Sequence, residues 1–570
     1  MRSNLIERQI KRIADAWLAA SVHIDAFRFD SAAYLTAVKW WFKRKRVRAR
    51  GQLAPLLSQS PKAYRLWVLR KDREGRRHSQ HGVAPLIIAL VEVAPGNKAG
   101  SDATLQSLAA EGVVSMLVET PGNLVQIAAT IDWDAQPWLM SLGMGDRIAP
   151  GTAAVYRAAI AAVAAREIGP GSEAPVSGPL PPRILFADDD QLNRRNRRAD
   201  PHFKPDWNSE LFVHHDYLTG ACIVQATRAD LEAVAGAEAA GQDGIGWAQQ
   251  LVARVASAGQ GAKMQARAPV HVRAMLHHRR VRIAPRLPAA PLIVARDLPP
   301  VTIIVPTRNR VDLLRTCLEG VAAADYPQVD VIVVDNDSDD AETLVYLAAL
   351  DPARYRVLRH SGPFNYSAIN NRAAAQAQGR LLCLLNNDIE MITPDWLAIM
   401  ACQALRADVG AVGARLLYPD GRIQHAGVVI GVGNAAGHAH RFVHPDEEGY
   451  FRRHSLPQFT SAVTAACLLV QRERFEAVGG LDEGNFAVAF NDVDLCLRLN
   501  QRGWQSLYEP RATLIHHESV SRGLDQDVVG AARFAGELAA LQRIWQTDQI
   551  TDPFHHPQLS RAAERFAVAL

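Results

Sequence analysis

VTIIVPTRNR (301–310), VDVIVVDNDSDD (329–340) and RLLCLLNNDIEM (380–391) are the three stretches that decide the fold of this chain. Each is an apolar run of strand length that ends in polar or acidic residues, and helix-like segments separate them. Continuous apolar strands that alternate with helices are typical of a parallel sheet covered on both faces. Open sheets of this kind bind ligands at the carboxyl ends of their strands. We therefore expect the polar ends of these stretches to border a ligand site.

The region before residue 290 repeats this plan. RILFADDDQL (183–192) is an apolar strand ending in acids, and Pro-Asp-Trp follows it at 205–207, as Pro-Asp-Trp follows the third stretch at 394–396. We interpret the repetition as two related α/β domains in tandem, divided at a proline-rich connection. The predicted division is a helical basic extension (1–80), a first domain (81–290), a second domain (291–545) and a tail expected to be a short helix (546–570).

Composition excludes several classes of protein. Hydrophobic residues make up 48% and charged residues 21% of the 570 residues, which excludes a disordered or collagen-like chain. No apolar stretch is long enough for a membrane span, and no apolar run follows the charged N-terminus as in a secretory signal. The six cysteines include no CxxC pair. We therefore expect a cytoplasmic protein without a disulfide framework or structural zinc.

The net charge of +4 hides an asymmetry: residues 1–80 carry +13, so the rest carries −9. The basic excess peaks in KWWFKRKRVRAR (39–50), where aromatic residues adjoin the bases. Such a run is either a solvated basic helix end packed by its tryptophans or a contact with anionic lipid at the inner face of the plasma membrane. We expect no nucleic-acid partner, because the rest of the chain is acidic and offers no extended basic groove.

Asp388 ends the third stretch, and the cluster Asp335-Asn336-Asp337 ends the second. An acid at a strand end can simply form a turn or cap the next helix. Two acidic strand ends side by side repel each other unless a cation or ligand donors lie between them, which favours a site for Mg²⁺ or Mn²⁺ on a diphosphate.

Two further groups are candidates for chemistry. Asp492 stands at the start of a predicted helix, where it either complements the helix dipole or acts as a general base. His516 and His517 follow a short apolar strand, and they are either surface or core residues, or a metal ligand or phosphate contact.

Taken in order, these segments resemble glycosyltransferase family 2 with the GT-A fold, the Rossmann-like fold of nucleotide-diphospho-sugar transferases. The resemblance covers roughly 300–525 and includes FNYSAINNRAAAQAQGR, TAACLLVQRERFEAVGGLDE and FNDVDLCLRLNQRGW. It implies Asp388 as metal-binding acid, Asp492 as catalytic base, and His516 and His517 beside the metal and diphosphate. The nucleotide-sugar contacts that it implies are Pro306, Thr307, Arg308, Asn309, Asp335, Asn336, Asp337, Asn365, Asn386 and Asn387.

The resemblance implies an inverting transfer from a nucleotide-diphosphate sugar to a glycan or lipid-linked glycan in bacterial surface-polysaccharide synthesis, with Mg²⁺ or Mn²⁺. Two residues depart from the family pattern: Asn386 replaces the first acid of the metal motif, and Asn491 replaces the glutamate usual before the base. These departures are the best support for the alternative of a non-catalytic sugar- or nucleotide-binding protein, whereas the retained Asp388, Asp492 and nucleotide-side pattern argue against it.

The first domain resembles a second, degenerate copy of the same family. Asp188 and Asp190 are the candidate metal-binding acids, and Asp243 in GQDGIGW is the candidate base. Its first two strands lack the Pro-Thr-Arg-Asn pattern and the acidic end, so we expect a scaffold or acceptor-holding role. A bifunctional enzyme with two active domains is the alternative.

Overall fold

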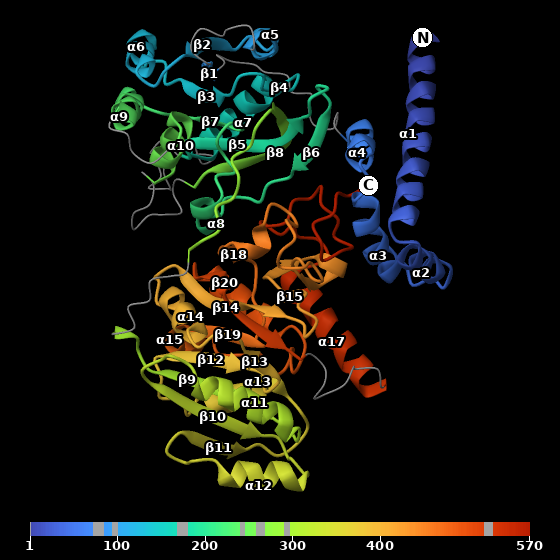
Figure 1. Ribbon diagram of the computed structural model, residues 1–570, viewed down its shortest axis with the longest axis vertical. Helices are drawn as coiled ribbons and strands as arrows, with labels where there is room; N and C mark the ends of the chain where they lie inside the picture. The colour runs from blue at the N-terminus through green and yellow to red at the C-terminus, as the bar shows by residue number, and fades with distance from the viewer. Residues whose placement is uncertain are drawn as a thin grey trace.

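The N-terminal part of the chain is helical, as predicted, and its helices lie along one side of the molecule (Figure 1). Among the residues that the structure describes, no helix is both long and apolar enough to cross a membrane. The computed structural model describes residues 2–71, 85–93, 101–167, 181–239, 245–257, 268–289, 297–517 and 528–570. The helices of this part are α1 (Arg2–Phe29), α2 (Ser31–Phe42), α3 (Arg46–Ser58) and α4 (Ala63–Lys71).

Two α/β units follow, each built around its own sheet, and they lie one above the other in Figure 1. The first sheet has the order β2-β1-β3-β7-β5-β8-β4, with β6 paired to β5. Its strands are β1 (Ile87–Glu92), β2 (Val114–Val118), β3 (Trp138–Leu142), β4 (Arg147–Ile148), β5 (Ile184–Leu192), β6 (Arg198–His202), β7 (Cys222–Val224) and β8 (Val270–Arg279). Its helices are α5 (Asp102–Ala110), α6 (Asn123–Thr130), α7 (Thr152–Glu167), α8 (Ser209–His214), α9 (Arg228–Ala239) and α10 (Trp247–Ser257).

The second sheet has the order β11-β10-β9-β12-β19-β14-β20-β13, with β15 paired to β14 and β18 to β20. Its strands are β9 (Val301–Thr307), β10 (Val329–Asp335), β11 (Tyr355–Arg359), β12 (Leu381–Leu385), β13 (Ile389–Met391), β14 (Val409–Leu417), β15 (Ile423–His425), β18 (Gln458–Thr460), β19 (Cys467–Gln471) and β20 (Gln505–His516); β16 (Val428–Ile430) and β17 (Ala436–His438) form a separate hairpin. The helices are α11 (Val311–Ala322), α12 (Ala341–Ala349), α13 (Tyr366–Ala374), α14 (Trp396–Ala404), α15 (Arg472–Ala477), α16 (Asn491–Gln501) and α17 (Val528–Trp545), with short 3₁₀ turns η4 (Val432–Asn434) and η5 (Arg453–Ser455).

The two sheets share one strand order. Reading across each sheet, β2, β1, β3, β7, β5, β8 and β4 take the places of β10, β9, β12, β19, β14, β20 and β13. Directions agree as well: the first three strands are parallel, the fourth is antiparallel to both neighbours, and the fifth and sixth are parallel. The described part of the first sheet lacks counterparts of the edge strand β11 and of β18, which pairs with β20.

The central strands of the second sheet are buried on both faces, which explains their unbroken apolar runs. Every residue of β9 and β12 is buried. Side chains that alternate along β9 enter two separate cores: Ile303 and Val305 belong to one, and Ile304 belongs to the other. The amphipathic face of α11 closes the first core with Leu314, among others. This packing fixes the strand ends, and with them the site.

Residues 546–570 run between the N-terminal helices and both α/β units (Figure 1). They contain no helix or regular strand, so the predicted short helix is wrong. The carbonyl of Pro553 accepts from the N–H of Asp206 at 2.7 Å, and Asp552 accepts from the N–H of Ile430 at 2.6 Å. The Trp67 indole donates to Gln558 at 3.0 Å. The tail therefore joins three parts of the molecule.

The strand order corrects the register of the internal repeat. The sequence comparison aligns the acids that follow Phe186 in β5 with the acids that follow β12. In the sheets, however, β5 takes the place of β14 and not of β12. The counterpart of β12 is β3, and Asp146 follows β3 just before the short strand β4. Asp146, and neither Asp188 nor Asp190, therefore occupies the position that Asp388 has in the second unit.

Candidate functional site

The ends of β9 and β10 form one wall of the candidate site in the second unit. Thr307 ends β9, Asp335 ends β10, and the two residues are paired in the parallel register. Both are almost fully buried. The N–H of Asn336 donates to the carbonyl of Thr307 at 2.9 Å, which holds the two strand ends together. Pro306 is buried inside β9 opposite Val334, and Arg308 is exposed.

Asn309 joins the loops that follow these two strands. Its φ of 55° lies in the left-handed region, where asparagine is more common than most residues. Its Oδ1 accepts from the N–H groups of Asp339 and Asp340 at 3.0 Å, and its Nδ2 donates to Asp339 at 2.7 Å. The side chain therefore supports the loops of the predicted nucleotide wall.

The amide of Asn336 leaves one acceptor free. Its Nδ2 donates to the carbonyls of His360 and Gly362, while its buried Oδ1 has no donor among the described residues. Asp337 accepts from the N–H of Gly362 at 2.9 Å, and this hydrogen bond lowers the pKa of the Asp337 carboxyl. An unpaired buried acceptor at a strand end suits a donor group of a ligand.

Asn365, predicted as a nucleotide-sugar contact, caps α13 instead. Its Oδ1 accepts from the N–H of Ala368 at 3.0 Å, and its Nδ2 donates to the carbonyl of Glu483 at 3.2 Å. Both ends of the amide are therefore engaged with the protein.

Asp388 and His516 face each other at the far side of this wall. His516 Nε2 lies 3.1 Å from Asp388 Oδ1, and both side chains are nearly buried. His516 Nδ1 lies 2.6 Å from Oε1 of Gln424, an acceptor, so the proton of the neutral ring belongs on Nδ1. Nε2 then presents a lone pair, and Asp388 Oδ1 has no hydrogen-bond donor within the described residues.

Two electron-pair donors at this distance can bind one cation as adjacent ligands, and a carboxylate oxygen with an imidazole nitrogen suits Mn²⁺ or Mg²⁺. The hydrogen bond to Gln424 is the support that usually orients a ligating histidine. The residues present therefore fit the metal that the family resemblance implies.

His517 points elsewhere. Its Nε2 lies 2.9 Å from Glu390 Oε2, and both side chains are partly exposed. Only its backbone N–H meets the metal acid, through the carbonyl of Asp388 at 3.0 Å. The structure brings one histidine of the predicted pair to Asp388.

Asn386 and Asn387, which precede Asp388, contact His516 and the end of β9. Asn387 Nδ2 donates to Thr307 Oγ1 at 3.1 Å, and Asn386 Nδ2 lies 3.4 Å from His516 Nε2. An aspartate at position 386 would bring a second carboxylate to this edge of the sheet. With asparagine at 386, the groups there are the Asp388 carboxylate, the His516 imidazole and the two amides of Asn386 and Asn387.

Asp492 is the second residue of α16. Phe490, the N-cap residue of that helix, has a φ of 63°, an uncommon conformation for a bulky residue and one that often marks functional sites. Burial raises the pKa of the Asp492 carboxyl, although the N–H groups of Ala465 and Val493 oppose the shift. A carboxylate with a raised pKa is a stronger general base.

A short segment connects Asp492 to the Asn386–Asp388 turn. The N–H of Ala465 donates to Asp492 Oδ2 at 3.0 Å, and the carbonyl of Ala466 accepts from the N–H of Asn386 at 3.0 Å. The side chain of Thr464 also hydrogen-bonds to Asp492. Asp492 and the Asn386–Asp388 turn thus lie on either side of one three-residue segment.

In the first unit, Asp146 has no free oxygen. Its Oδ2 accepts from the N–H of Gly143 at 3.0 Å, and its Oδ1 accepts from the N–H of Arg280 at 2.7 Å. His278, in the register position of His516, contacts Asp190 Oδ1 at 2.7 Å. The sequence does not identify Asp146 as the counterpart of Asp388, because a glycine-rich turn, Gly143-Met144-Gly145, separates Asp146 from the end of β3.

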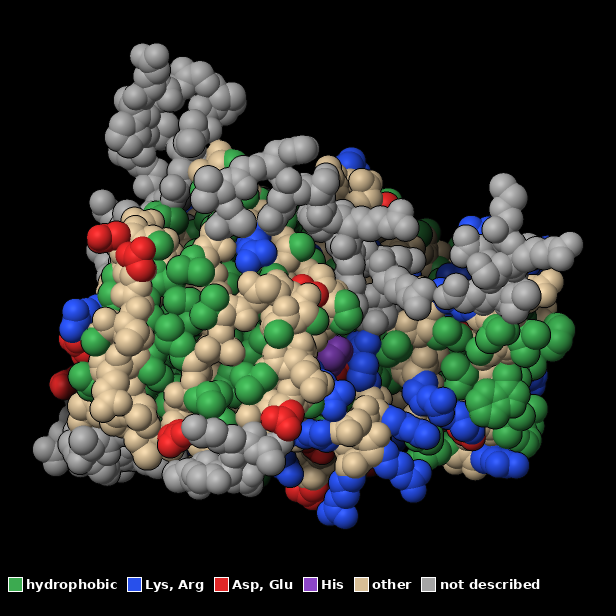
Figure 2. Space-filling model, turned by 90° about the horizontal axis from the view of Figure 1, so that it is seen from above, with side chains coloured by type: hydrophobic (Ala, Val, Ile, Leu, Met, Phe, Trp, Pro, Cys, Tyr) green, Lys and Arg blue, Asp and Glu red, His purple; other side chains and the backbone are tan. Residues whose placement is uncertain are grey.

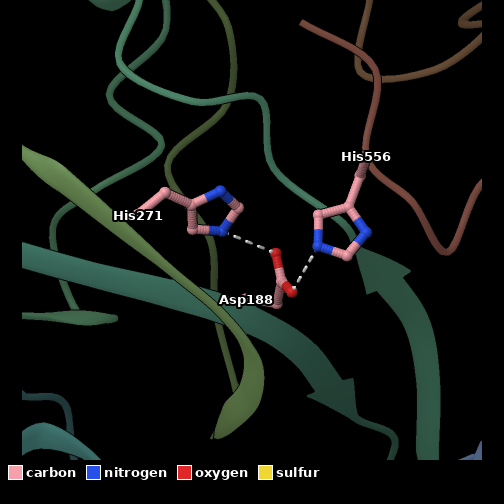
Figure 3. A group of neighbouring side chains, drawn as sticks. All are labelled: Asp188, His271 and His556. Carbon is pink, nitrogen blue, oxygen red and sulfur yellow. Dashed lines mark hydrogen bonds and ion pairs between the residues drawn. The ribbon is translucent and has the colours of Figure 1, made fainter. Parts of the chain in front are cut away.

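Asp188 lies in a buried group with His271 and His556, whose ligand atoms are close enough to hold a metal (Figure 3). The N–H of Gln558 donates to His556 Nδ1 at 3.0 Å, and His556 Nε2 lies 3.0 Å from Asp188. On the other side of the same carboxylate, His271 Nε2 lies 3.1 Å from Asp188. These contacts of Asp188 connect the tail to β8.

Asp190 is likewise paired inside the protein, with Arg198, His278 and the hydroxyl of Tyr64. Asp243 lies outside the described residues. The first unit thus uses its predicted metal-binding acids as internal ion-pair partners.

Residues 302–465 match the family model described as glycosyl transferase family 2. This domain belongs to that family. The match begins within β9 and ends at Ala465, so it includes the Asn386–Asp388 turn and stops short of Asp492 and His516. The identification agrees with the GT-A type of α/β fold predicted for this region.

The chain is 38% identical over 419 residues to the uncharacterized protein y4gI of Sinorhizobium fredii, covering 68% of this chain and 46% of that protein. It is 36% identical over 410 residues to the O-antigen biosynthesis protein RfbC of Myxococcus xanthus, covering 67% of this chain and 32% of that protein. The chain thus spans less than half the length of these relatives. A solved mannosyltransferase of Pyrobaculum calidifontis, PcManGT with GDP-Man and Mn²⁺, shares 20% identity over 46% of this chain and 68% of its own, with a TM-score of 0.34.

A shorter match is 46% identical over 63 residues, 11% of this chain and 20% of the relative. That relative is the N-acetylglucosaminyl-diphospho-decaprenol L-rhamnosyltransferase of Mycobacterium tuberculosis.

Proposed function

We propose that this chain transfers a sugar from a nucleotide-diphosphate sugar to a glycan or lipid-linked glycan during synthesis of a bacterial surface polysaccharide. The family of residues 302–465 and the names of the O-antigen and rhamnosyltransferase relatives support this class of reaction. The observation that carries the proposal is the pair of facing donors, Asp388 Oδ1 and His516 Nε2, at the end of a nucleotide-type sheet.

The donor binds along the ends of β9, β10 and β12. Thr307, Asp335 and the free acceptor of Asn336 border its nucleoside, and the Asn386–Asp388 turn borders its diphosphate. Asp388 and His516 hold the Mn²⁺ or Mg²⁺, which supplies positive charge to the departing diphosphate when bound.

Asp492 takes the proton. The acceptor hydroxyl oxygen forms a bond to the anomeric carbon as the bond from that carbon to the diphosphate oxygen breaks, and the hydroxyl proton passes to the Asp492 carboxylate. Attack from the face opposite the leaving group inverts the anomeric centre. The hydrogen bonds from Ala465 and Val493 keep the carboxylate in place for this transfer.

The first unit acts as a scaffold in this proposal. Both oxygens of Asp146 are bonded to backbone N–H groups, and Asp188 and Asp190 are bonded to side chains, so no free carboxylate remains for a metal at these positions. We also place the protein on the cytoplasmic side, because all six cysteines are free, which suits a reducing compartment.

The test measures nucleoside-diphosphate release from UDP-, GDP- and dTDP-sugars with Mn²⁺ and an extract of lipid-linked glycans, together with thermal shifts. We expect one nucleotide sugar to give release with the wild type. The Asp492→Asn variant should lower that release by about 10²–10⁴-fold while keeping the thermal shift with the same nucleotide.

Asp351→Asn, at an exposed residue after α12, is the matched control and should behave as the wild type. Equal release by Asp492→Asn and the wild type would remove the proposed base. Thermal shifts without release in any protein would favour the non-catalytic binding protein. Release that survives in Asp492→Asn but stops in a variant of the first unit would favour two active domains.

A further inference from the structure

Exposed large hydrophobic side chains concentrate in the N-terminal helices. Of the 25 such residues in the described part of the chain, ten lie between positions 10 and 47. Five of the seven aromatic residues in this set are among them: Trp17, Phe27, Phe29, Trp41 and Phe42. Scattered exposed hydrophobic residues need no explanation, but a contiguous concentration marks an interaction surface.

The turn between α2 and α3 is the centre of this concentration. Residues 41–48, WFKRKRVR, are all exposed, with Phe42 at 81% and Val47 at 64% of full exposure. The turn is nevertheless ordered by backbone bonds: the N–H of Arg44 donates to the carbonyl of Trp41 at 3.0 Å, and the N–H of Lys45 to that of Trp40 at 2.9 Å. Because the turn keeps these apolar side chains exposed to water, a partner that buries them would lower the free energy.

An apolar stripe on α1 extends the surface. Ile10, Ile13, Trp17 and Ile24 follow one another at intervals of three, four and seven residues, which puts them on one helix face, and each is more than half exposed. The opposite face of α1 packs inward through Leu18 and Val22. Figure 2 shows hydrophobic and basic side chains side by side at the end of the molecule where these helices lie.

Charge accompanies the apolar residues. Residues 1–50 contain 12 Lys and Arg and four Asp and Glu, a net charge of +8. Three of the acids have partners within the protein: Asp15 pairs with Arg70 at 2.6 Å, Asp25 with Lys62 at 3.0 Å, and Asp30 caps α2. The turn itself contains five basic residues and no acid.

The surface is attached firmly to the rest of the molecule. Ser58 Oγ at the end of α3 accepts from the N–H of Val568, and Tyr64 and Trp67 of α4 contact Asp190 and Gln558. A Cβ at Gly51 would lie 2.9 Å from the carbonyl of Ala562, so α3 packs closely on the tail. Whatever binds the surface is therefore held at a fixed position relative to both sheets.

We propose that the α2–α3 turn and the outer face of α1 bind an anionic lipid bilayer, with Trp41 and Phe42 entering the headgroup region and residues 43–48 contacting lipid phosphates. Aromatic tips beside clustered bases suit an interface that is apolar inside and negatively charged outside. A symmetric second copy would place two surfaces of charge +8 against each other, which disfavours it. The inference goes beyond the proposed transfer reaction, because lipid binding needs neither donor nor Asp492.

The test is co-sedimentation of the full chain with vesicles of phosphatidylcholine alone or with 30% phosphatidylglycerol, at low and high salt. We expect binding that requires phosphatidylglycerol and weakens as salt rises. Trp41→Ser/Phe42→Ser and Lys43→Glu/Arg44→Glu/Lys45→Glu should each weaken it at least tenfold, with unchanged nucleotide thermal shifts.

Two controls match these changes. Val345→Ser removes an apolar side chain of 70% exposure on α12, and Arg194→Glu/Arg195→Glu/Arg197→Glu reverses three charges in the exposed turn between β5 and β6. Both should bind vesicles as the wild type does. An equal loss in the arginine control would overturn the assignment of the surface, as would equal binding to both vesicle types, dimerisation through the turn in sedimentation velocity, or binding to nucleic acid in place of vesicles.

Discussion

The turn after β12 and the turn after β3 occupy the same place in two sheets of the same strand order, yet their acids differ. Asp388 has an oxygen without a donor, facing the lone pair of His516. Asp146 receives a backbone N–H on each oxygen, and its neighbour His278 turns to Asp190. An acid at a strand end is therefore not enough for a metal site, because the local backbone decides whether the carboxylate remains free.

The largest effect should come from exchanging the two acids for alanine. Asp388→Ala removes the charge that fits the metal, so we expect sugar transfer to fall by about 10³-fold or more and Mn²⁺ to stop strengthening nucleotide binding. Asp146→Ala should leave both unchanged and cost about 1–3 kcal/mol of folding free energy, since two partly buried N–H groups lose their acceptor.

Transfer assays and denaturant titrations of the two variants measure these differences. A loss of transfer in Asp146→Ala at full folding would show that the first unit binds donor, and the contrast between the two turns would fail.

The second expected effect is the pH dependence of Asp492, which should change the transfer activity and the folding stability in opposite directions. Burial raises the pKa of this carboxyl in the folded protein, so the folded state binds the proton more tightly and ionisation at neutral pH costs folding free energy. Transfer should fall as pH decreases through the raised pKa, because the base becomes protonated. Asp492→Asn should be inactive yet melt at a higher temperature than the wild type at pH 7.

Melting curves at pH 5 and pH 7 provide the check. The gain in Tm should shrink at the lower pH, because a raised pKa gives the wild-type carboxyl a larger protonated fraction there. A variant that is less stable at both values would contradict the assigned cause of the shift.

A smaller effect should appear where the first unit uses its acids for structure. Burial disfavours a charge on His271, but the carboxylates of Asp188 and Asp206 outweigh it and raise the pKa of the ring. Stability from this cation is fully present below its ordinary pKa of about 6.5 and is lost as pH rises through the raised value. His271→Asn should therefore lower Tm more at pH 6 than at pH 8.5.

His556→Asn provides the comparison, since it removes the other imidazole that contacts Asp188 and leaves His271 in place. If added Zn²⁺ or Mn²⁺ raised the Tm of the wild type but not of His556→Asn, the group in Figure 3 would be a metal site after all.

The smallest effect tests Asn365. As the cap of α13, Asn365→Ala should cost about 1 kcal/mol of stability and leave nucleotide affinity unchanged. Asn365→Asp keeps the capping oxygen and should retain most of the stability. A fall in nucleotide affinity with normal stability would restore the role predicted from the sequence.

The strand ends of the second unit could be found from the sequence because β9, β10 and β12 are mainly apolar and are followed or ended by polar residues. β9 ends at Thr307, β10 ends at Asp335, and β12 ends just before Asn386. The partners that define the chemistry could not be found, since they come from distant segments: Gln424 fixes the proton of His516, and Ala465 holds Asp492. Adjacent residues of a strand face opposite sides of the sheet. The sequence therefore could not show which of His516 and His517 faces Asp388.

The first unit was misread for a related reason. Three consecutive acids at 188–190 look like an exposed strand end, but they lie inside β5. Lys204 and Arg282 pair with Asp189, Arg198 pairs with Asp190, and two histidines contact Asp188. Lys204 is itself fully buried. The sequence pattern does not show that a charge is compensated by a residue far along the chain. Asp146, a single acid after a glycine-rich turn, occupies the position that corresponds to Asp388.

The tail also has a consequence for how the molecule is assembled. Its hydrogen bonds to Ser58 and Trp67 join residues 510 and 491 positions apart. Such contacts close very long loops of the chain. Closing a long loop costs conformational entropy, which slows the folding of the elements that depend on these contacts. On the ribosome, α4 can pack on the first unit through Tyr64 and Asp190 as soon as that unit folds, but the contacts of α3 and α4 with the tail must wait for residues 558–568. The basic surface should therefore gain its last supports only after the second sheet has been synthesised.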